Sequence, residues 1–443
     1  MSRSLYARII RLGLPILIGQ LGTIVVGFAD TTMVGHYSTE ALASASFVNN
    51  VFNVAMFASL GFAYGLTPLV GALFSQGAGH RIGTLMRTAV AANLLFALLL
   101  TAIMSVVYFN LHLLGQPEEL LPVIRPYFLI VLSGMVPVTL FNVFAQWSYA
   151  INRTRMPMWI ILSANAINIL GNYLLIYGHW GLPEMGLNGA GISTLAARLI
   201  SMTAIMIIFF TQNQFRDYRK GFLSGRIRPS SFRRVNATSW PVALQMSFES
   251  GSFTMAAVMS GWISATALAA FQVVVILGTL GFCIYYSMAA AVSVLVSNAA
   301  GLSDRRLMRR TAGVGYVIML VLATASSLLF IFGGAHIMPL FTDDPAVISL
   351  ALTLIVPLAL YQYGDATQIT FANALRGTSR VMPMFWISLI SYIVVGIPAT
   401  WTLAFPCRMG IYGIILSFSL SLFLAAALFL YFFMRTTRSR SLH

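Results

Sequence analysis

Three of the eleven acidic residues, Asp30, Glu249 and Asp365, lie inside long apolar stretches of the chain. An ionised acid at the centre of a membrane helix costs on the order of 2.5–3.5 kcal/mol on insertion scales. The cost is tolerable if the acid faces water, pairs with a cation or is protonated, so each acid predicts a site for H⁺ or Na⁺. The structural alternative is a pair with Arg198, the only basic residue in the interior of a predicted span, which would neutralise one acid only.

Asparagines recur at helical spacing in one of these stretches. Asn165, Asn168 and Asn172 follow one another every three to four residues, so a helix presents them as one polar stripe. Thr194 lies in the next apolar stretch. Oxygen-rich clusters suit a hard cation, whereas each asparagine alone would equally serve a hydrogen bond between helices. For the stripe together with Asp30 we favour a cation site.

Polar residues also accompany the other two acids. Gln245 precedes Glu249 by one helical turn. Tyr361 and Gln368 stand four residues before and three residues after Asp365, which places them on the same helix face as this acid. These groups predict a second cation site.

Aromatic and methionine side chains stand close to the acids in sequence. Such side chains form adaptable apolar surfaces that accept flat cations. The alternative for each of them is ordinary packing. The residues that we expect to line a ligand cavity, two glutamines included, are Met33, Gln245, Phe248, Phe253, Tyr285, Tyr363 and Gln368.

The elements that must position these residues are membrane helices. The chain has 443 residues, of which 58% are hydrophobic and 8% are charged, and its mean hydropathy is +0.85. Soluble domains carry roughly 25% charged residues, so most of the outer surface must face membrane lipid. The net charge of +15 does not indicate nucleic acid, because nearly all basic residues lie in short loops between apolar stretches.

Cysteine and histidine are too sparse for redox or metal chemistry. Cys283 and Cys407 offer neither a disulfide framework nor a metal-ligand spacing, and the six histidines are scattered. A GxxxxGK[ST] nucleotide-binding loop is also missing from the sequence. We therefore expect no cofactor, and any use of ATP would need another chain.

Twelve apolar stretches are long enough to cross a bilayer, which takes roughly 20 residues. We expect an all-α integral membrane protein whose spans fall at about 12–34, 47–73, 88–111, 122–150, 157–178, 188–211, 237–262, 268–296, 311–334, 346–374, 383–405 and 410–434.

The loops between these spans alternate in charge. One set holds nearly all of the 26 basic residues, including the segment 216–234 and Arg440, while the other holds acids such as Glu118 and Asp343. Arginine-rich loops face the cytoplasm. Both termini are therefore expected in the cytoplasm.

The second half of the chain repeats the first. One constant shift aligns residues 41–43 with 267–269, both Ala-Leu-Ala, and 156–159 with 382–385. The same shift aligns Pro15 with Pro241. An even number of spans in each repeat gives two six-helix bundles related by a pseudo-two-fold axis along the membrane normal, with a cavity between them. We expect an N-lobe at 1–211, a basic cytoplasmic linker at 212–236, a C-lobe at 237–434 and a basic cytoplasmic tail at 435–443.

Several of these runs resemble the MATE family of multidrug and toxic compound extrusion transporters, in its NorM-like branch. The run Gly27-Phe28-Ala29-Asp30-Thr31-Thr32-Met33-Val34-Gly35 is similar to the first-helix signature of that family. Residues 149–154, followed by Pro157, resemble its loop after helix four, and Glu249 and Asp365 resemble the acids of the NorM-like branch. The resemblance covers essentially the whole chain.

The resemblance implies a secondary active antiporter that exports drugs or other cationic amphipathic compounds in exchange for H⁺ or Na⁺. Such a protein alternates between inward-open and outward-open V-shaped states. It would be a monomeric, multi-pass protein of a bacterial inner membrane. The cation-binding residues would be Asp30, Asn168, Asn172 and Thr194 in the N-lobe and Glu249, Tyr361 and Asp365 in the C-lobe.

The coupling ion stays open at this point. Glu249 and Asp365 would hold Na⁺ if the chain is sodium-coupled. Some relatives have an acid at the position of Asn172. Because this chain has an asparagine there, its N-lobe site has a single carboxylate, that of Asp30.

Two other functions compete with this interpretation. A lipid-linked oligosaccharide flippase has similar helical halves, but its cavity should hold several basic residues that grip phosphate groups. An intramembrane aspartyl protease is suggested by Tyr363-Gly364-Asp365. However, such proteases need a glycine where this chain has Gln362, and they show no six-helix duplication.

Overall fold

The computed structural model describes residues 2–438, and all regular secondary structure within them is helical. The first half forms α1 (Ser2–Tyr37), α2 (Thr39–Tyr64), α3 (Leu66–Ser75), α4 (Gly79–Phe109), α5 (Leu121–Ser133), α6 (Met135–Ala150), α7 (Arg155–Tyr177), α8 (Gly186–Thr211) and α9 (Arg216–Ser224). The second half forms α10 (Pro229–Ile263), α11 (Ala265–Gly301), α12 (Arg305–Ile337), α13 (Pro345–Thr353), α14 (Ile355–Gly377), α15 (Met382–Ser388), the π-helix Leu389–Gly396, α16 (Ile397–Ala404) and α17 (Gly410–Arg438). Short 3₁₀ helices lie at Leu111–Leu114, Glu118–Leu120, His179–Gly181, Asn213–Phe215 and Met338–Leu340.

The spans agree with those expected from the sequence. Among the described residues, ten helical segments are long and apolar enough to cross a membrane, and α13 with α14 adds an eleventh, bent by 52°. The remaining long helix is α10, whose polar residues, Glu249 among them, make it less apolar. Twelve spans are consistent with this set. Large apolar side chains such as Val106 (62% exposed) and Phe332 (79% exposed) point outward, as lipid-facing residues do.

The chain divides into two compact units. Ile18–Ala243 forms one, which we term the N-terminal unit; the described residues before Ile18 and from Leu244 onward form the other, the C-terminal unit. The lobe and linker boundaries expected from the sequence stay a prediction. Of the expected basic tail, residues 439–443, Arg440 included, lie outside the described residues.

Repeat-equivalent residues have the same local structure. Ser38 accepts a hydrogen bond from the backbone N–H of Ala41 at the start of α2, and Ser264, its equivalent in the second half, accepts one from Ala267 at the start of α11. These are N-caps, which satisfy backbone donors that the first helical turn leaves free. Left-handed backbone also recurs in pairs of equivalent loops, at Gly77 and Ser303, Asn152 and Ser379, and Gly186 and Gly410. The structure thus supports the internal duplication.

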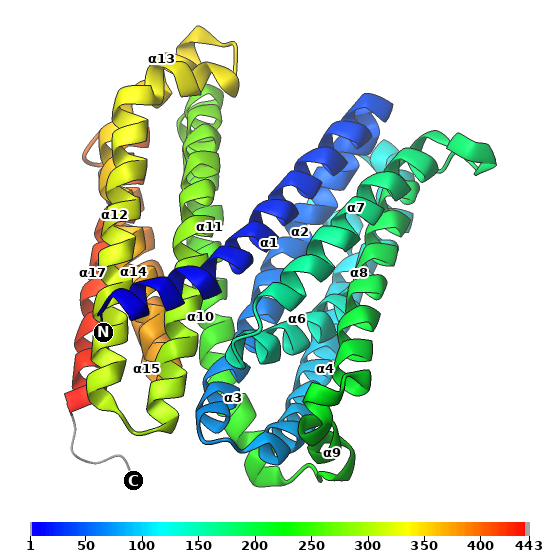
Figure 1. The fold of residues 1–443 in the computed structure, drawn as a ribbon. Helices are drawn as coiled ribbons and strands as arrows, with labels where there is room; N and C mark the ends of the chain where they lie inside the picture. The colour runs from blue at the N-terminus through cyan, green and yellow to red at the C-terminus, as the bar shows by residue number, and fades with distance from the viewer. Residues whose placement is uncertain (1, 439–443) are drawn as a thin grey trace. The chain divides into compact units, whose positions relative to one another are not determined.

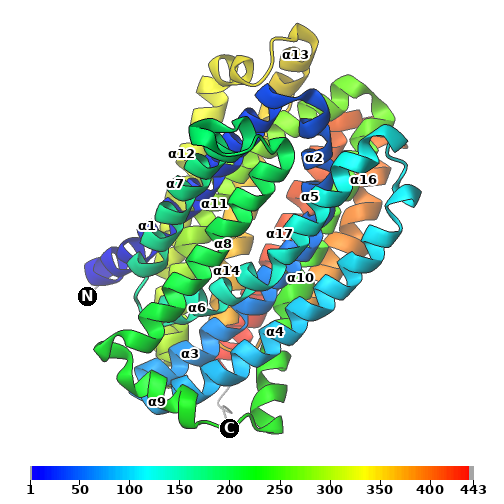
Figure 2. The ribbon, with the colours of Figure 1, turned by 90° about the vertical axis from the view of Figure 1, so that its right-hand side faces the viewer.

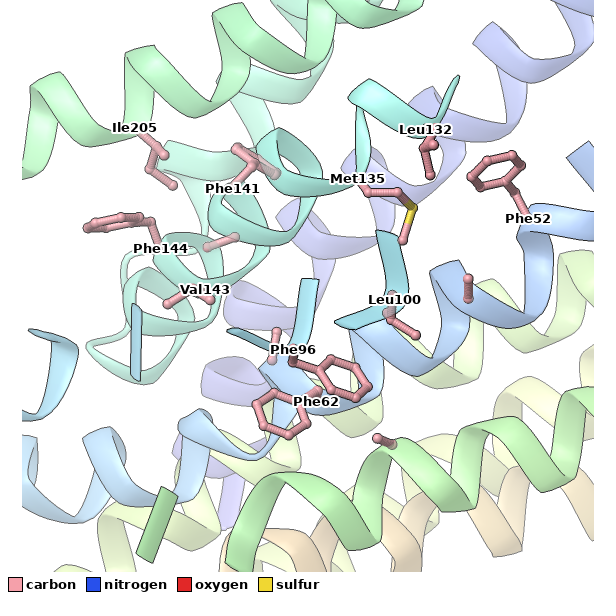
Figure 3. Packing of buried hydrophobic residues seen from close by; sticks show 14 of the residues in the cluster. Phe52, Phe62, Phe96, Leu100, Leu132, Met135, Phe141, Val143, Phe144 and Ile205 are labelled. Atoms are coloured by element: carbon pink, nitrogen blue, oxygen red, sulfur yellow. The ribbon is translucent and has the colours of Figure 1, made fainter. Parts of the chain in front are cut away.

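Aromatic and small residues build the core of the N-terminal unit. Phe62 of α2 stacks on Phe96 of α4 with ring centroids 4.3 Å apart (Figure 3). Trp240 meets both rings edge-on. A Cβ atom on Gly61 would lie 2.8 Å from the Cα atom of Ala243, so this glycine lets two helix backbones touch. Close backbone approach of this kind drives helix association in lipid, where the hydrophobic effect does not.

Helix α14 is the central helix of the C-terminal unit. It packs against α11, α12 and α17, and these helices surround it in Figure 1. Within this arrangement the fully buried Tyr285 of α11 packs with Met319 of α12 and with Ala366 and Ile369 of α14. Asp365, next to Ala366 on the buried face of α14, is thereby held in the interior of the unit.

The linker between the halves contains the short helix α9, which lies at the same end of the N-terminal unit as α3 in both ribbon views (Figures 1 and 2). Arg87 of α4 donates hydrogen bonds of 3.2 and 3.0 Å to the carbonyl oxygens of Phe222 and Leu223. An arginine at this place neutralises the partial negative charge at the C-terminal end of α9. Burial raises the pKa of the Tyr218 hydroxyl in the same helix.

Candidate functional site

The N-terminal unit brings Asp30 of α1 together with Asn172 of α7. The side-chain amide of Asn172 donates a hydrogen bond to Oδ1 of Asp30. Asp30 is half-buried, whereas Asn172 is fully buried. The amide group of Asn172 therefore donates to the carboxyl group of Asp30, and this hydrogen bond connects α7 with α1.

The stripe predicted on α7 also reaches α8. The amide of Asn168 donates to Oγ1 of Thr194 over 3.1 Å, and Ser193 donates to the carbonyl oxygen of Asn168 over 2.7 Å. The two helices lie side by side in both ribbon views (Figures 1 and 2). Asn165, the third member, has a buried amide nitrogen without a hydrogen-bond partner in residues 2–438. Two of the three asparagines thus make the interhelical hydrogen bonds that were the alternative to a cation site.

A cavity of about 180 Å³ adjoins this network. Asp30 and Thr194 line it, together with Arg198 of α8, Asn49 of α2 and Tyr127 of α5. Asn49 and Tyr127 were not selected from the sequence, because neither is charged. The cavity lies wholly within the N-terminal unit and brings four helices to one space.

Arg198 does not neutralise Asp30 by direct contact. Both side chains face the cavity and attract one another electrostatically. However, among the described residues Arg198 forms no ion pair within 4.0 Å and no hydrogen bond. The structural alternative of a paired acid is therefore not realised in this conformation.

The C-terminal unit brings Glu249 of α10 near Asp365 of α14. The amide of Gln245 donates to Oε2 of Glu249 over 3.0 Å. Asp365 is 1% exposed, and its Oδ2 atom has no hydrogen-bond partner within the described part of the chain. The two carboxyl groups interact electrostatically, and within the described residues Glu249 is the charged group that acts on Asp365. A buried carboxyl group without a basic partner requires a proton or a metal cation to be stable.

Tyrosine hydroxyls surround this pair. Tyr361 lies one turn before Asp365 on α14 and interacts electrostatically with both acids. Tyr392, from the π-helix, does the same, and its buried hydroxyl lacks a hydrogen-bond partner in residues 2–438. Tyr392 was not among the residues selected from the sequence, although a tyrosine within an apolar span is a signal of the same kind as Tyr361.

The aromatic residues expected to line a cavity make packing contacts. Phe253 stacks on Phe418 with centroids 4.5 Å apart and meets Tyr361 edge-on at 6.4 Å. Phe248 lies 5.8 Å from Phe385. These contacts are all within the C-terminal unit. A substrate cavity at these residues stays a prediction.

The other candidates for the cavity form hydrogen bonds or remain unpaired. Tyr285, which is fully buried, donates to Oε1 of Gln362 over 2.8 Å. Tyr363 donates to Thr324 over 3.0 Å. Gln368 is buried with an unpartnered Oε1 atom in the described structure. Met33 belongs to the other unit, where its side chain packs on the core and its carbonyl accepts a hydrogen bond from Tyr177.

The described residues contain no cluster of side chains that would suit a transition metal. Within residues 2–438, no three His, Cys, Asp or Glu side chains are grouped to hold a metal ion. Cys283 is buried, Cys407 is exposed, and both are free thiols.

A family model described as MatE matches residues 15–174 and again residues 241–402. The chain belongs to the MatE family. The two matches begin at Pro15 and Pro241, which the shift between the halves of the sequence also aligns. Members of this family are transporters, so this MatE chain is a multi-pass membrane transporter and not an enzyme. The intramembrane protease alternative is thereby excluded.

Curated relatives and solved structures agree with this assignment. The MatE chain is 30% identical over 427 residues to a probable multidrug resistance protein NorM from Bradyrhizobium diazoefficiens, covering 96% of the chain and 92% of the relative. It is 28% identical to a protein of the same description from Geobacillus kaustophilus, covering 92% and 90% of the two chains. A substituted form of the MATE transporter VcmN from Vibrio cholerae has the same fold, with a TM-score of 0.89 at 15% identity over 99% and 98% of the two chains.

Proposed function

We propose that this chain is a secondary active multidrug efflux antiporter that exports cationic amphipathic compounds in exchange for H⁺ or Na⁺ by alternating access. The observation that carries the proposal is the carboxyl pair of Glu249 and Asp365 in the C-terminal unit, which has no basic partner among residues 2–438. Asp365 is fully buried and Glu249 is half-buried. The two NorM relatives are described as probable multidrug resistance proteins, which supports the proposed class of substrate.

The proposed cation sites are those expected from the resemblance. In the C-terminal unit, Glu249, Asp365 and the hydroxyl of Tyr361 would hold H⁺ or Na⁺. In the N-terminal unit, Asp30 would do so, supported by the amide of Asn172. An entering cation would compete with a cationic drug for these acids, and the two ligands would favour different states of the transporter. The membrane potential adds about 2.3 kcal/mol per charge per 100 mV.

The charge of the loops supports the proposed orientation, and the bacterial NorM relatives support the proposed location. We place both termini in the cytoplasm, because the arginine-rich loops are on their side, and we place the protein in a bacterial inner membrane as a monomer. A flippase would need several basic groups to grip phosphate. Arg198 is the one basic side chain among the residues that line the described cavity, which favours the drug antiporter.

The test is reconstitution in liposomes with a fluorescent organic cation inside. A pH gradient and a Na⁺ gradient are imposed separately, and dye efflux is followed. We expect one of the two gradients to drive efflux in the wild type and neither to do so in Asp365→Asn or Glu249→Gln. Asp343→Asn, which changes an exposed loop acid, serves as the control. Unchanged efflux in both buried-acid variants would contradict the proposal.

A further inference from the structure

The linker between the halves, residues 212–236, contains a dense group of basic side chains. It has seven basic residues and one acid, Asp217. Arg219 is used inside the fold, because its guanidinium group donates to the carbonyl oxygen of Phe210 near the C-terminal end of α8. The other six are exposed and form no ion pair within 4.0 Å in residues 2–438. These six, which we term the basic linker group, are Arg216, Lys220, Arg226, Arg228, Arg233 and Arg234.

The helix that carries part of this group is fixed on the N-terminal unit. Two aromatic side chains of α9 pack on the core of this unit. A Cβ atom on Gly221 would lie 2.0 Å from the carbonyl oxygen of His80 in α4, so the two backbones are in direct contact. The opposite face of α9 presents Arg216, Lys220 and Leu223, which follow one another at helical spacing and are all exposed. The docked helix therefore presents its charges in a fixed direction, as a flexible loop in water would not.

Two exposed apolar residues lie among these charges. Leu223 is 64% exposed, and Ile227, which stands between Arg226 and Arg228, is 46% exposed. A single exposed leucine needs no explanation. However, basic side chains interspersed with apolar ones are typical of segments that lie in the headgroup region of a membrane. There the apolar side chains reach the acyl chains while the basic ones contact phosphate groups.

The linker also joins the ends of two membrane helices, so it lies close to the bilayer surface. It follows α8, which is long and apolar enough to cross the membrane, and it leads into α10. In α10 the indole of Trp240, which is 39% exposed, donates to Oδ1 of Asn236 over 3.2 Å. Tryptophan concentrates at the interface between membrane and water. Arg234 precedes Trp240 by six residues, or about 9 Å along the helix, which brings phospholipid headgroups within its reach.

We propose that the basic linker group binds anionic phospholipids of the adjacent leaflet, with Leu223 and Ile227 inserted among the acyl chains. Juxtamembrane groups of roughly four to eight basic residues attract anionic lipid, and arginine matches phosphate with two parallel hydrogen bonds. A soluble polyanion would use the charges but not the exposed apolar pair, so the structure favours lipid. The inference goes beyond the proposed function, because lipid binding requires neither a drug nor an ion gradient.

The alternative is that these basic residues serve only to orient the chain during membrane insertion. Any attraction for anionic lipid would then be diffuse, and a basic loop elsewhere with the same expected orientation would contribute equally. The junction of α11 and α12 offers this comparison, because it presents two exposed arginines, Arg306 and Arg310, close in sequence to the exposed Leu302.

The test is a titration of the purified full-length protein in detergent, in which native mass spectrometry counts the bound lipid. The probes are phosphatidylglycerol, which is anionic, and phosphatidylcholine with the same acyl chains. We expect the wild type to bind phosphatidylglycerol more tightly. In Arg226→Gln/Arg228→Gln the affinity for phosphatidylglycerol should fall by about tenfold or more, whereas phosphatidylcholine should bind as before. The matched control, Arg306→Gln/Arg310→Gln, should retain the wild-type preference.

Two further measurements examine the apolar pair and the kind of ligand. Leu223→Ser/Ile227→Ser should weaken the binding of phosphatidylglycerol by about fivefold or more, whereas Leu302→Ser should not weaken it. sn-Glycerol 3-phosphate, which has the phosphate group without acyl chains, should fail to displace the lipid. Because all of the substituted side chains are exposed, we expect each variant to keep the unfolding temperature of the wild type.

Equal affinities of the wild type for the two lipids would overturn the proposal, as would an equal loss of phosphatidylglycerol binding in the two double-arginine variants. Displacement of the lipid by sn-glycerol 3-phosphate, with no effect of Leu223→Ser/Ile227→Ser, would show a general anion site and would also overturn it. None of these measurements involves a substrate or a gradient. Their failure therefore leaves the proposed antiporter untouched, and failure of the efflux assay leaves the lipid site untouched.

Discussion

Asn172 donates its amide hydrogen to Oδ1 of Asp30, which joins α7 to α1 beside the cavity that contains Arg198. The pair is one of two cross-helix hydrogen bonds that the asparagine side chains of the stripe donate within the described residues, the other being from Asn168 to Thr194. A polar stripe on a membrane helix is satisfied in this way because lipid offers no hydrogen-bond partner. The hydrogen bond between Asn172 and Asp30 can therefore serve both the packing of the two helices and the position of the carboxylate. A substitution of Asn172 tests both roles, because stability and transport are measured separately.

Replacement of Asn172 by leucine should reduce stability and alter transport together. The variant loses a cross-helix hydrogen bond, and such bonds contribute on the order of 0.6–1.7 kcal/mol in membrane proteins. Thermal unfolding in detergent and dye efflux in liposomes measure the two effects. The matched control is Asn165→Leu, because that amide nitrogen is buried without a partner in the described structure, and its removal should be neutral or stabilising. Equal losses in the two variants would show that the hydrogen bond to Asp30 has no special role.

Replacement of Gly83 by alanine should loosen the linker helix. A Cβ atom there would lie 1.9 Å from the carbonyl oxygen of Tyr218, a distance that forces α9 away from α4. Overpacking of this kind typically costs about 1–3 kcal/mol, and proteolysis of the segment that follows Ser224 should become faster. Gly313→Ala is the control, since no heavy atom lies within 4 Å of its Cβ position and alanine favours a helix by roughly 0.5–1 kcal/mol.

Replacement of Tyr285 by phenylalanine should destabilise the C-terminal unit. Its hydroxyl donates to Oε1 of the buried Gln362, whose Nε2 atom already lacks a partner within the described residues. The variant would leave the whole amide unpaired, at a cost of about 1–3 kcal/mol. Tyr363→Phe removes a hydrogen bond at an exposed position, to Thr324, and should cost less. A thermal shift of equal size in the two variants would contradict this account.

The helices could be predicted from the sequence, and their internal breaks could not. A bilayer leaves the backbone no partner but itself, so apolar stretches of about 20 residues must be helical, and the stretch predicted at 88–111 is α4. The stretch predicted at 237–262 belongs to α10, although the polar residues of this helix make it less apolar than the others. The break at Gly134 and the π-helix depend on contacts between helices, such as Gly134 with Arg198, which no local pattern encodes.

Partners on the same helix could be predicted, and partners on different helices could not. The pair Gln245 and Glu249 follows directly from helical spacing. In contrast, the sequence could not assign Asp30 to Asn172 rather than to Arg198, because the choice depends on how α1, α7 and α8 pack. Tyr392 was missed for the same reason, since its span has no charged residue and its electrostatic partners, Glu249 and Asp365, lie on α10 and α14.

The internal duplication explains the arrangement of the helices in the two halves, but not the positions of Asp30 and Asp365. The shift between the halves aligns Asp365 with Thr139, which is fully buried and shares a 2.7 Å hydrogen bond with Ser59. Asp30 aligns with Ala256, which lines a small void in the C-terminal unit. The equivalent of Asp365 is thus a buried polar residue, Thr139, and the equivalent of Asp30 is a buried apolar residue, Ala256. The two units share a scaffold and differ in the groups that titrate or bind cations.

The π-helix Leu389–Gly396 presents Tyr392 to the carboxyl pair of the C-terminal unit. A π-helix inserts an extra residue into a helical turn and is frequent at functional sites. Gly396 permits it here, because a Cβ atom would lie 2.8 Å from the carbonyl oxygen of Ser391 and 2.9 Å from Oγ of Ser421. Tyr392 also lines a void of about 10 Å³, close to the size of one water molecule.

Replacement of Tyr392 by phenylalanine should therefore leave stability unchanged while weakening the ion dependence of transport. The hydroxyl is buried and unpartnered within residues 2–438, so its removal deletes no hydrogen bond that folding has gained. If the hydroxyl helps Glu249 and Asp365 to hold the coupling cation, the concentration of H⁺ or Na⁺ that half-saturates efflux should rise by about tenfold, the effect expected for one ligand to a charged group. Tyr431→Phe, at an exposed position of α17, should change neither quantity. A fall in the unfolding temperature with an unchanged ion dependence would instead make Tyr392 a packing residue of the π-helix.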